Sequence, residues 1–182
     1  MSLVELLAQA DERSLAASGL ACLDRCVPLL GEDDEVLRPL WAALAADEDW
    51  REPLGRARDV LGGAPEEGDE AAVLAHRMLG AVPEERASGP LREWADACSV
   101  AALQVHRLLD AVADGGRTVS ARREGRTDDM SPLVAAELRR QTTILEVLSG
   151  RGAGGLRQAL DLSAEGRRVL RAVVSRRARV RR

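Results

Sequence analysis

Residues 90–113, PLREWADACSVAALQVHRLLDAVA, carry the most regular apolar pattern of the chain and decide its fold. Apolar residues recur there at alternating steps of three and four: Leu91, Trp94, Cys98, Ala101, Val105, Leu108 and Val112. This spacing places them on one face of an α-helix. Because Gly89 and Pro90 suit a helix start, the stretch predicts a long helix that packs lengthwise against other helices.

Two arrangements would bury this apolar face. In the first, 90–113 is the central helix of a bundle within one chain. In the second, a homodimer forms through a coiled coil whose interface consists of Leu91, Trp94, Cys98, Val105, Leu108 and Val112. Cys98 and Ala101 are small and would make a weak dimer core, which favours the bundle.

The rest of the chain also predicts helices. Alanine and leucine, both strong helix formers, supply 30 and 27 of the 182 residues, and no segment alternates as a strand would. Apolar spacing predicts further helices over 2–17, 19–30, 34–46, 50–61 and 67–81. The predicted fold class is therefore all-α, a multi-helix bundle or a short helical-hairpin array.

The chain divides into three segments. Residues 1–113 form the predicted acidic helical bundle. Residues 114–131 contain three glycines, many charges and one large aliphatic residue, Val119, which is typical of a flexible linker or loop. Residues 132–182 predict a C-terminal helical pair with an arginine-rich end.

The boundaries of this C-terminal pair follow from its capping residues. Ser131 is the expected cap and Pro132 the first residue of one helix, which stops at Gly150. Four glycines within 150–155 predict a hinge. Ser163 is the expected cap of the last helix.

Charge is distributed unevenly along the chain. Residues 1–100 hold 21 acidic residues and nine arginines, whereas residues 151–182 hold ten arginines and two acidic residues. All 26 basic residues are arginine, which reflects a GC-rich genome that we take to be bacterial. The candidate anion-binding or partner-binding residues of the basic end are Arg167, Arg168, Arg171, Arg176, Arg177, Arg179, Arg181 and Arg182.

Three hypotheses account for the basic end. It neutralises the acidic residues of the same chain, or it binds an acidic protein surface, or it binds nucleic acid through the phosphates. No aromatic residue follows Trp94, which disfavours base stacking on a single strand. A helix-turn-helix over 156–174 would need its turn at Asp161, where a glycine is expected.

No residues are predicted to be catalytic, to bind a cofactor or to bind a metal. His76 and His106 would need further ligands at zinc-site spacing, and none occurs. Cys22 and Cys26 flank apolar residues, as core thiols do. The glycines of 150–155 lack the Lys-Ser/Thr that follows in a phosphate loop. Enzymatic activity is therefore disfavoured, although not excluded.

The remaining features bear on location and function. No apolar run approaches the length of a membrane span, the start resembles no signal peptide, and three cysteines are too few for a disulfide framework. We expect a cytoplasmic protein without a membrane partner. The favoured function is a non-catalytic all-helical interaction module (adaptor, regulatory or immunity-type) with a protein partner. The alternative is a DNA-binding transcriptional regulator that uses the basic helices of 151–182.

Overall fold

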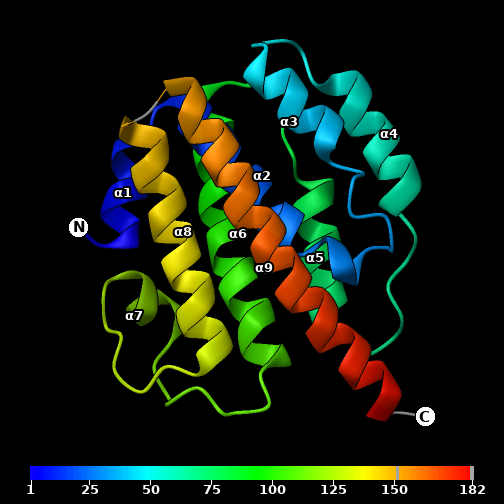
Figure 1. The fold of residues 1–182 in the computed structure, drawn as a ribbon, viewed down its shortest axis with the longest axis vertical. Coiled ribbons are helices and arrows are strands. Elements are labelled where there is room, and N and C mark those ends of the chain that lie inside the picture. Colours follow the sequence, from blue (N-terminus) through cyan, green and yellow to red (C-terminus); the bar gives the residue numbers. More distant parts are fainter. Residues whose placement is uncertain (151, 181–182) are drawn as a thin grey trace.

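Figure 1 shows the computed structural model of the chain, which describes residues 1–150 and 152–180. This part of the chain is all-helical and contains no strand, so the predicted fold class is confirmed. The helices are α1 (Leu3–Gln9), α2 (Glu12–Arg25), the short 3-10 helix η1 (Val27–Leu29), α3 (Arg38–Ala45), α4 (Arg51–Leu61), α5 (Glu70–Gly80), α6 (Ser88–Leu109), α7 (Val119–Arg123), α8 (Pro132–Gly150) and α9 (Gly152–Val180).

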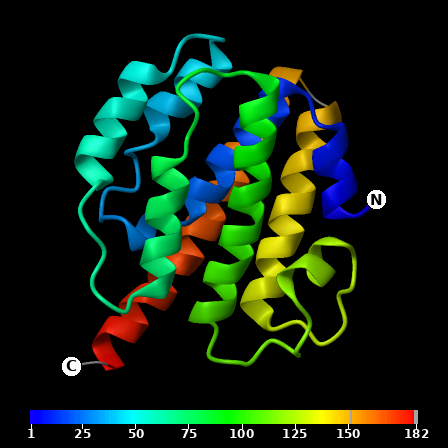
Figure 2. The ribbon, with the colours of Figure 1, turned by 180° about the vertical axis from the view of Figure 1, so that it is seen from behind.

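Four helices form the centre of the bundle. α2 packs against α6, α8 and α9, and α6 also packs against α5 and α8. α9 crosses diagonally in front of α2 and α6 in Figure 1, and Figure 2 shows α5 and α6 on the opposite side. One apolar core extends from Leu3 to Val173, so the segments 1–113 and 132–182 contribute to the same core.

The long predicted helix is α6, and its apolar face is buried within the chain. Leu91, Trp94, Cys98 and Val105 lie in the core, and Leu108 is half-buried against it. The helices that cover this face are α2, α5 and α8 of the same chain. The bundle arrangement therefore accounts for the heptad-like pattern.

α6 ends four residues earlier than the sequence pattern predicts. Asp110 has an extended backbone, and its carboxylate accepts hydrogen bonds from the amides of Val112 (3.0 Å) and Leu133 (2.8 Å). This side chain therefore ends one helix and caps the next. Val112 consequently lies outside the helix and is 55% exposed, so it does not belong to the apolar face.

The predicted break between helices 2–17 and 19–30 is wrong. The break falls at Ala10, because Asp11 accepts a hydrogen bond from the amide of Ser14 (2.8 Å) and caps α2. α2 then continues through Gly19, whose missing side chain leaves space for the ring of Trp94. A Cβ atom at Gly19 would lie 2.4 Å from the ring of Trp94, so only glycine allows this contact.

Residues 114–131, predicted to form a flexible linker, contain the short helix α7 and a set of ion pairs. The buried carboxylate of Asp114 accepts hydrogen bonds from Arg107 (2.6 Å), from Arg122 (3.1 Å) and from the amide of Ser131 (2.9 Å). Arg122 is fully buried. These contacts connect the segment to the end of α6 and to the start of α8.

The first helix of the C-terminal pair starts and stops as predicted, but its cap differs. α8 begins at Pro132 and ends at Gly150. The Ser131 hydroxyl is buried and bonds to no described residue, since Asp110 accepts from the Leu133 amide instead. The predicted cap at Ser131 is therefore wrong.

The predicted start of the last helix at Ser163 is wrong as well. α9 begins at Gly152 and continues past Asp161, so the turn of a helix-turn-helix is absent there. Ser163 lies inside α9 and donates to the carbonyl of Ala159 (2.8 Å) rather than capping a helix. Gly155 is a packing residue, because a Cβ atom there would lie 2.7 Å from the Val147 carbonyl oxygen.

Candidate functional site

The most unusual internal feature is a fully buried ion pair between α2 and α8. Both side chains, Arg25 and Glu137, have no exposed surface. Nε of Arg25 donates to Oε2 of Glu137 at 2.8 Å, and Nη2 donates to Oε1 at 2.7 Å. This two-point geometry is the strongest that the two side chains can form.

Polar neighbours from other positions complete the cluster around Glu137. His106 Nδ1 lies 2.6 Å from the carbonyl oxygen of Ala102, and this nitrogen must carry the proton because a carbonyl only accepts. His106 Nε2 lies 3.5 Å from Oε2 of Glu137. The Gln141 amide donates to Oε1 at 2.9 Å. α2, α6 and α8 thus all contribute to this cluster, and the pair holds them together.

The electrostatics of the cluster keep Glu137 charged and His106 neutral. Burial alone would raise the pKa of Glu137, but the charge and hydrogen bonds of Arg25 and the Gln141 amide lower it to about 2. Burial lowers the pKa of His106, although Glu137 opposes that effect. At neutral pH the cluster therefore holds one arginine cation, one carboxylate and a neutral imidazole.

A chain of hydrogen bonds connects this cluster to the surface. The Ser99 hydroxyl donates to Gln141 at 2.6 Å, and Arg123 Nε donates to the same hydroxyl at 3.1 Å. Arg123 also pairs with Asp96, whose side chain is exposed. These groups bond to one another, so the arrangement fixes the packing of α6, α7 and α8 and presents no free acid, base or nucleophile.

The cysteines are equally unsuited to nucleophilic chemistry. Cys22, Cys26 and Cys98 are all buried and form no disulfide. Burial raises the pKa of the Cys22 thiol to about 12 and raises the pKa values of Cys26 and Cys98 well above the usual value. Protonated thiols of this kind are core residues, as the sequence predicted.

The structure brings no metal site together in the described residues. Within 1–150 and 152–180, no group of three His, Cys, Asp or Glu side chains could hold a metal ion. The two ring nitrogens of His106 face Ala102 and Glu137. His76 lies half-buried on α5 and does not join them.

The inner arginines of α9 pair with acidic residues of the N-terminal region. Arg167 is 8% exposed and pairs with Asp24, whose other carboxylate oxygen accepts from Trp41 Nε1 at 2.8 Å. Arg171 donates to Asp34 at 2.5 Å and to the carbonyl of residue 31 at 2.9 Å. These two arginines therefore neutralise acidic residues of the same chain, as the first of the three hypotheses states.

The outer arginines of α9 behave differently. Arg176, Arg177 and Arg179 are exposed, as is Arg168 between the two inner arginines, and none of the four pairs with a carboxylate among the residues that the structure describes. The candidates Arg181 and Arg182 lie outside the described residues.

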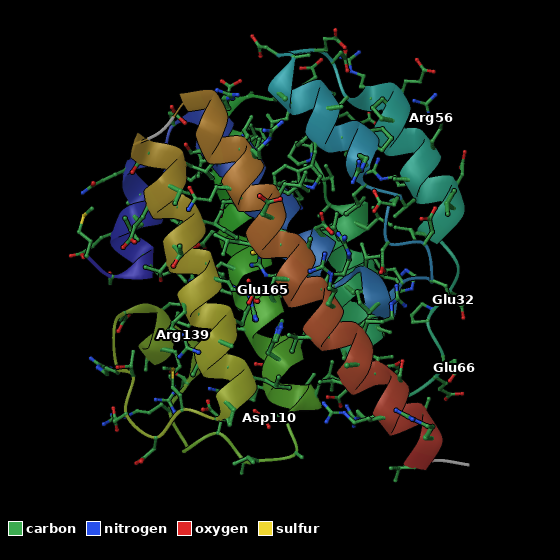
Figure 3. All side chains as sticks on the ribbon, in the orientation of Figure 1. Glu32, Arg56, Glu66, Asp110, Arg139 and Glu165 are labelled. Atoms are coloured by element: carbon green, nitrogen blue, oxygen red, sulfur yellow. The ribbon has the colours of Figure 1, made fainter. Side chains whose placement is uncertain are left out.

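An open groove of about 550 Å³ lies beside these outer arginines. Its apolar lining comes from the end of α6 and the turn after it, the start of α8 and the last turns of α9: Leu109, Ala111, Leu133, Val173 and Val180. Arg176 and Arg177 also line it. Figure 3 labels Asp110, a third charged lining residue, at this end of the molecule.

Comparison with known proteins identifies no relative: no family model matches the chain, and no curated protein or solved structure is significantly similar to it. None of the described helices combines the length and the apolar character that crossing a bilayer requires. The fold and the candidate site therefore define the chain as an all-α helical bundle with an internal ion-pair cluster and one apolar, arginine-edged groove.

Proposed function

We propose that this chain is a non-catalytic helical binding module, of the adaptor, regulatory or immunity-type kind, whose partner is a protein that contacts the groove beside α9. One contrast carries the proposal. The charges of the buried cluster bond to one another, whereas the groove combines an apolar lining, in which Ala111 and Val180 are exposed, with arginines that lack carboxylate partners. Protein interfaces are enriched in arginine around an apolar centre.

Two further observations support this proposal. The first favours binding over catalysis, and the second favours a location in the cytoplasm. Catalysis needs an accessible acid, base or nucleophile, while Glu137 and His106 are buried and bonded. The three cysteines are free thiols, which fits a reducing compartment.

The test is a comparison of captured proteins. The tagged full-length chain, the variant Ala111→Trp and the control Val60→Trp are each incubated with lysate of the native host. Ala111 is an exposed lining residue of the groove, and Val60 is an exposed residue of α4. We expect one protein to be enriched by the wild type and by Val60→Trp, and lost with Ala111→Trp. Identical sets of proteins for all three baits would contradict the proposal.

DNA binding through the basic end is the alternative outcome. It would appear as retention on duplex DNA that weakens as salt rises and is lost in the variant Arg176→Glu with Arg177→Glu. The apolar lining of the groove favours the protein partner, because a phosphate backbone gains nothing from apolar contacts.

A further inference from the structure

We infer that the groove beside α9 takes an acidic amphipathic helix of the partner protein. This inference rests on the proposed function and adds the chemistry of the bound segment. It depends on three observations: the shape of the groove, the composition of its lining and the charge at its edge.

Two common ways to bind a protein segment do not fit this groove. Adding a strand requires an exposed sheet edge, and the described residues contain no strand. Binding a proline-rich segment requires aromatic side chains in the groove. The three tryptophans, Trp41, Trp50 and Trp94, are buried elsewhere. An apolar groove between helix ends fits a third mode, in which the apolar face of a helix lies in the groove.

The lining supplies the apolar contacts that such a helix needs. Leu109 and Val173 form the buried part of the groove, and Leu133 is half-buried. Val180 is 87% exposed at the end of α9. Apolar residues spaced three and four apart on a partner helix would cover these side chains and remove them from water.

The charge at the edge selects an acidic helix. Arg176 and Arg177 line the groove and pair with no carboxylate among the described residues. Arg177 also donates to the carbonyl of Leu108 at 3.4 Å, which places its guanidinium beside the end of α6. The one acidic lining residue, Asp110, is bonded to the amides of Val112 and Leu133. Glutamates or aspartates flanking the apolar face of the partner helix would complement the arginines.

The inference is tested with designed peptides and fluorescence anisotropy. The probe is a labelled alanine-based peptide of about 18 residues, long enough to be helical in isolation. It carries leucines at helical spacing and glutamates beside them. One control peptide has the leucines in scrambled order, and the other has lysine in place of each glutamate. We expect the probe to bind the wild-type chain about tenfold more tightly than either control peptide.

Two protein variants locate the binding. Arg176→Glu with Arg177→Glu should weaken binding of the probe by about tenfold or more. Arg157→Glu with Arg168→Glu is the matched control, because both residues are exposed on α9 and do not line the groove. The two double substitutions change the net charge of the chain equally. The control should bind the probe within about twofold of the wild type. Circular dichroism checks that both variants remain helical.

Several outcomes would overturn the inference. These are equal binding of the probe and the scrambled peptide, equal weakening by the two variants, or no binding of the probe at all. If the wild type sediments as a dimer and the Arg176→Glu with Arg177→Glu variant sediments as a monomer, a second copy of the chain would be the occupant of the groove. If the wild type is retained on DNA and the same variant is not, nucleic acid would be the occupant of the groove. If the capture experiment finds a groove-dependent protein but the probe does not bind, the proposed function stands and only the acidic helix fails.

Discussion

The arginine-rich end of α9 has two halves, residues 164–172 (the inner half) and residues 173–180 (the outer half), which carry the same residue type and use it differently. On the inner half, Arg167 and Arg171 pair with Asp24 and Asp34 of the acidic N-terminal region. On the outer half, Arg176 and Arg177 line an open groove without a carboxylate partner in the described chain. The charge asymmetry of the sequence therefore has two parts: the inner arginines pair with carboxylates of the same chain, and the outer arginines are the ones to which the proposed function gives a binding role.

The inner half also covers the buried ion pair. Gly166 of α9 lies over the side chain of Arg25, since a Cβ atom at this position would be 2.5 Å from Arg25 Cδ. The Arg25–Glu137 pair and the Asp24–Arg167 pair thus lie under the same part of α9. If this comparison of the two halves is correct, changes to the inner half reduce stability and changes to the outer half do not.

The largest effect is expected for Glu137→Gln. The substitution keeps the shape of the side chain but leaves the buried guanidinium of Arg25 without a counter-charge. Breaking a fully buried pair from one side costs about 3–5 kcal/mol. Urea unfolding at pH 7 measures the loss.

The double variant Arg25→Met with Glu137→Leu is the control for this prediction. It removes both charges and leaves apolar side chains of comparable size. We expect it to recover more than half of the loss, because replacing a whole buried pair is nearly neutral. A loss below about 1 kcal/mol for Glu137→Gln alone would show that the pair is not the stabilising feature we describe.

Acid should reduce stability in two successive steps. The pKa of Glu137 is lowered from its usual 4.5 to about 2, so the unfolded chain takes up a proton between these values that the folded chain does not. The stabilisation is complete above pH 4.5 and is lost as the pH falls, by up to about 3 kcal/mol. The lowered pKa of His106 acts in the same direction, starting below its usual value of 6.5. Asp24, whose pKa is raised by burial, acts in the opposite direction.

As the pH falls, the effect of His106 comes before that of Glu137. Comparison of the wild type with the variant His106→Gln isolates this effect of His106. Urea midpoints are measured at pH 7, 5.5 and 4 for both proteins. The wild type should lose stability between pH 7 and 5.5, whereas the variant should hold its midpoint over that interval because it lacks the buried imidazole whose pKa folding lowers. An equal decline in both proteins would assign the effect to other groups.

The comparison between the halves is tested directly by Arg167→Ala and Arg176→Ala. The first variant leaves the buried carboxylate of Asp24 without its cation, and we expect a loss of about 2–3 kcal/mol. The second removes an exposed side chain and should change the free energy of unfolding by less than about 0.5 kcal/mol. Equal losses in urea unfolding would mean that the outer arginine has a structural role as well.

The sequence predicted the helices well where the apolar spacing was regular. α6 and α8 were recognised because their apolar residues repeat at helical spacing and Pro132 and Gly150 mark the ends of α8. The break between α1 and α2 was predicted at residue 18, beside Gly19, whereas it falls at Ala10. In the structure this glycine gives space to Trp94, which is a tertiary contact and leaves no local signal.

The candidate site was predicted only in part. The sequence singled out the arginines of α9 but gave no means to separate the inner from the outer ones, since their partners Asp24 and Asp34 lie more than 130 residues away. Arg25 and Glu137 were missed for the same reason, being 112 residues apart. The one available signal was a charged residue at a position that helical spacing assigns to the buried face.

Among the changes to the inner half of α9, the smallest loss is expected from one added methyl group. Gly166→Ala places a Cβ atom against Arg25 Cδ, which the buried ion pair holds in position. Overpacking of this kind costs about 1–3 kcal/mol, against a gain in helix propensity of about 1 kcal/mol. We therefore expect a net loss of about 1 kcal/mol in urea unfolding. The control is Gly55→Ala in α4, where a Cβ atom meets nothing within 4 Å and the propensity gain should stabilise the protein. If both variants stabilised the protein, α9 would not lie close to Arg25, and the distinction between its two halves would lose its structural basis.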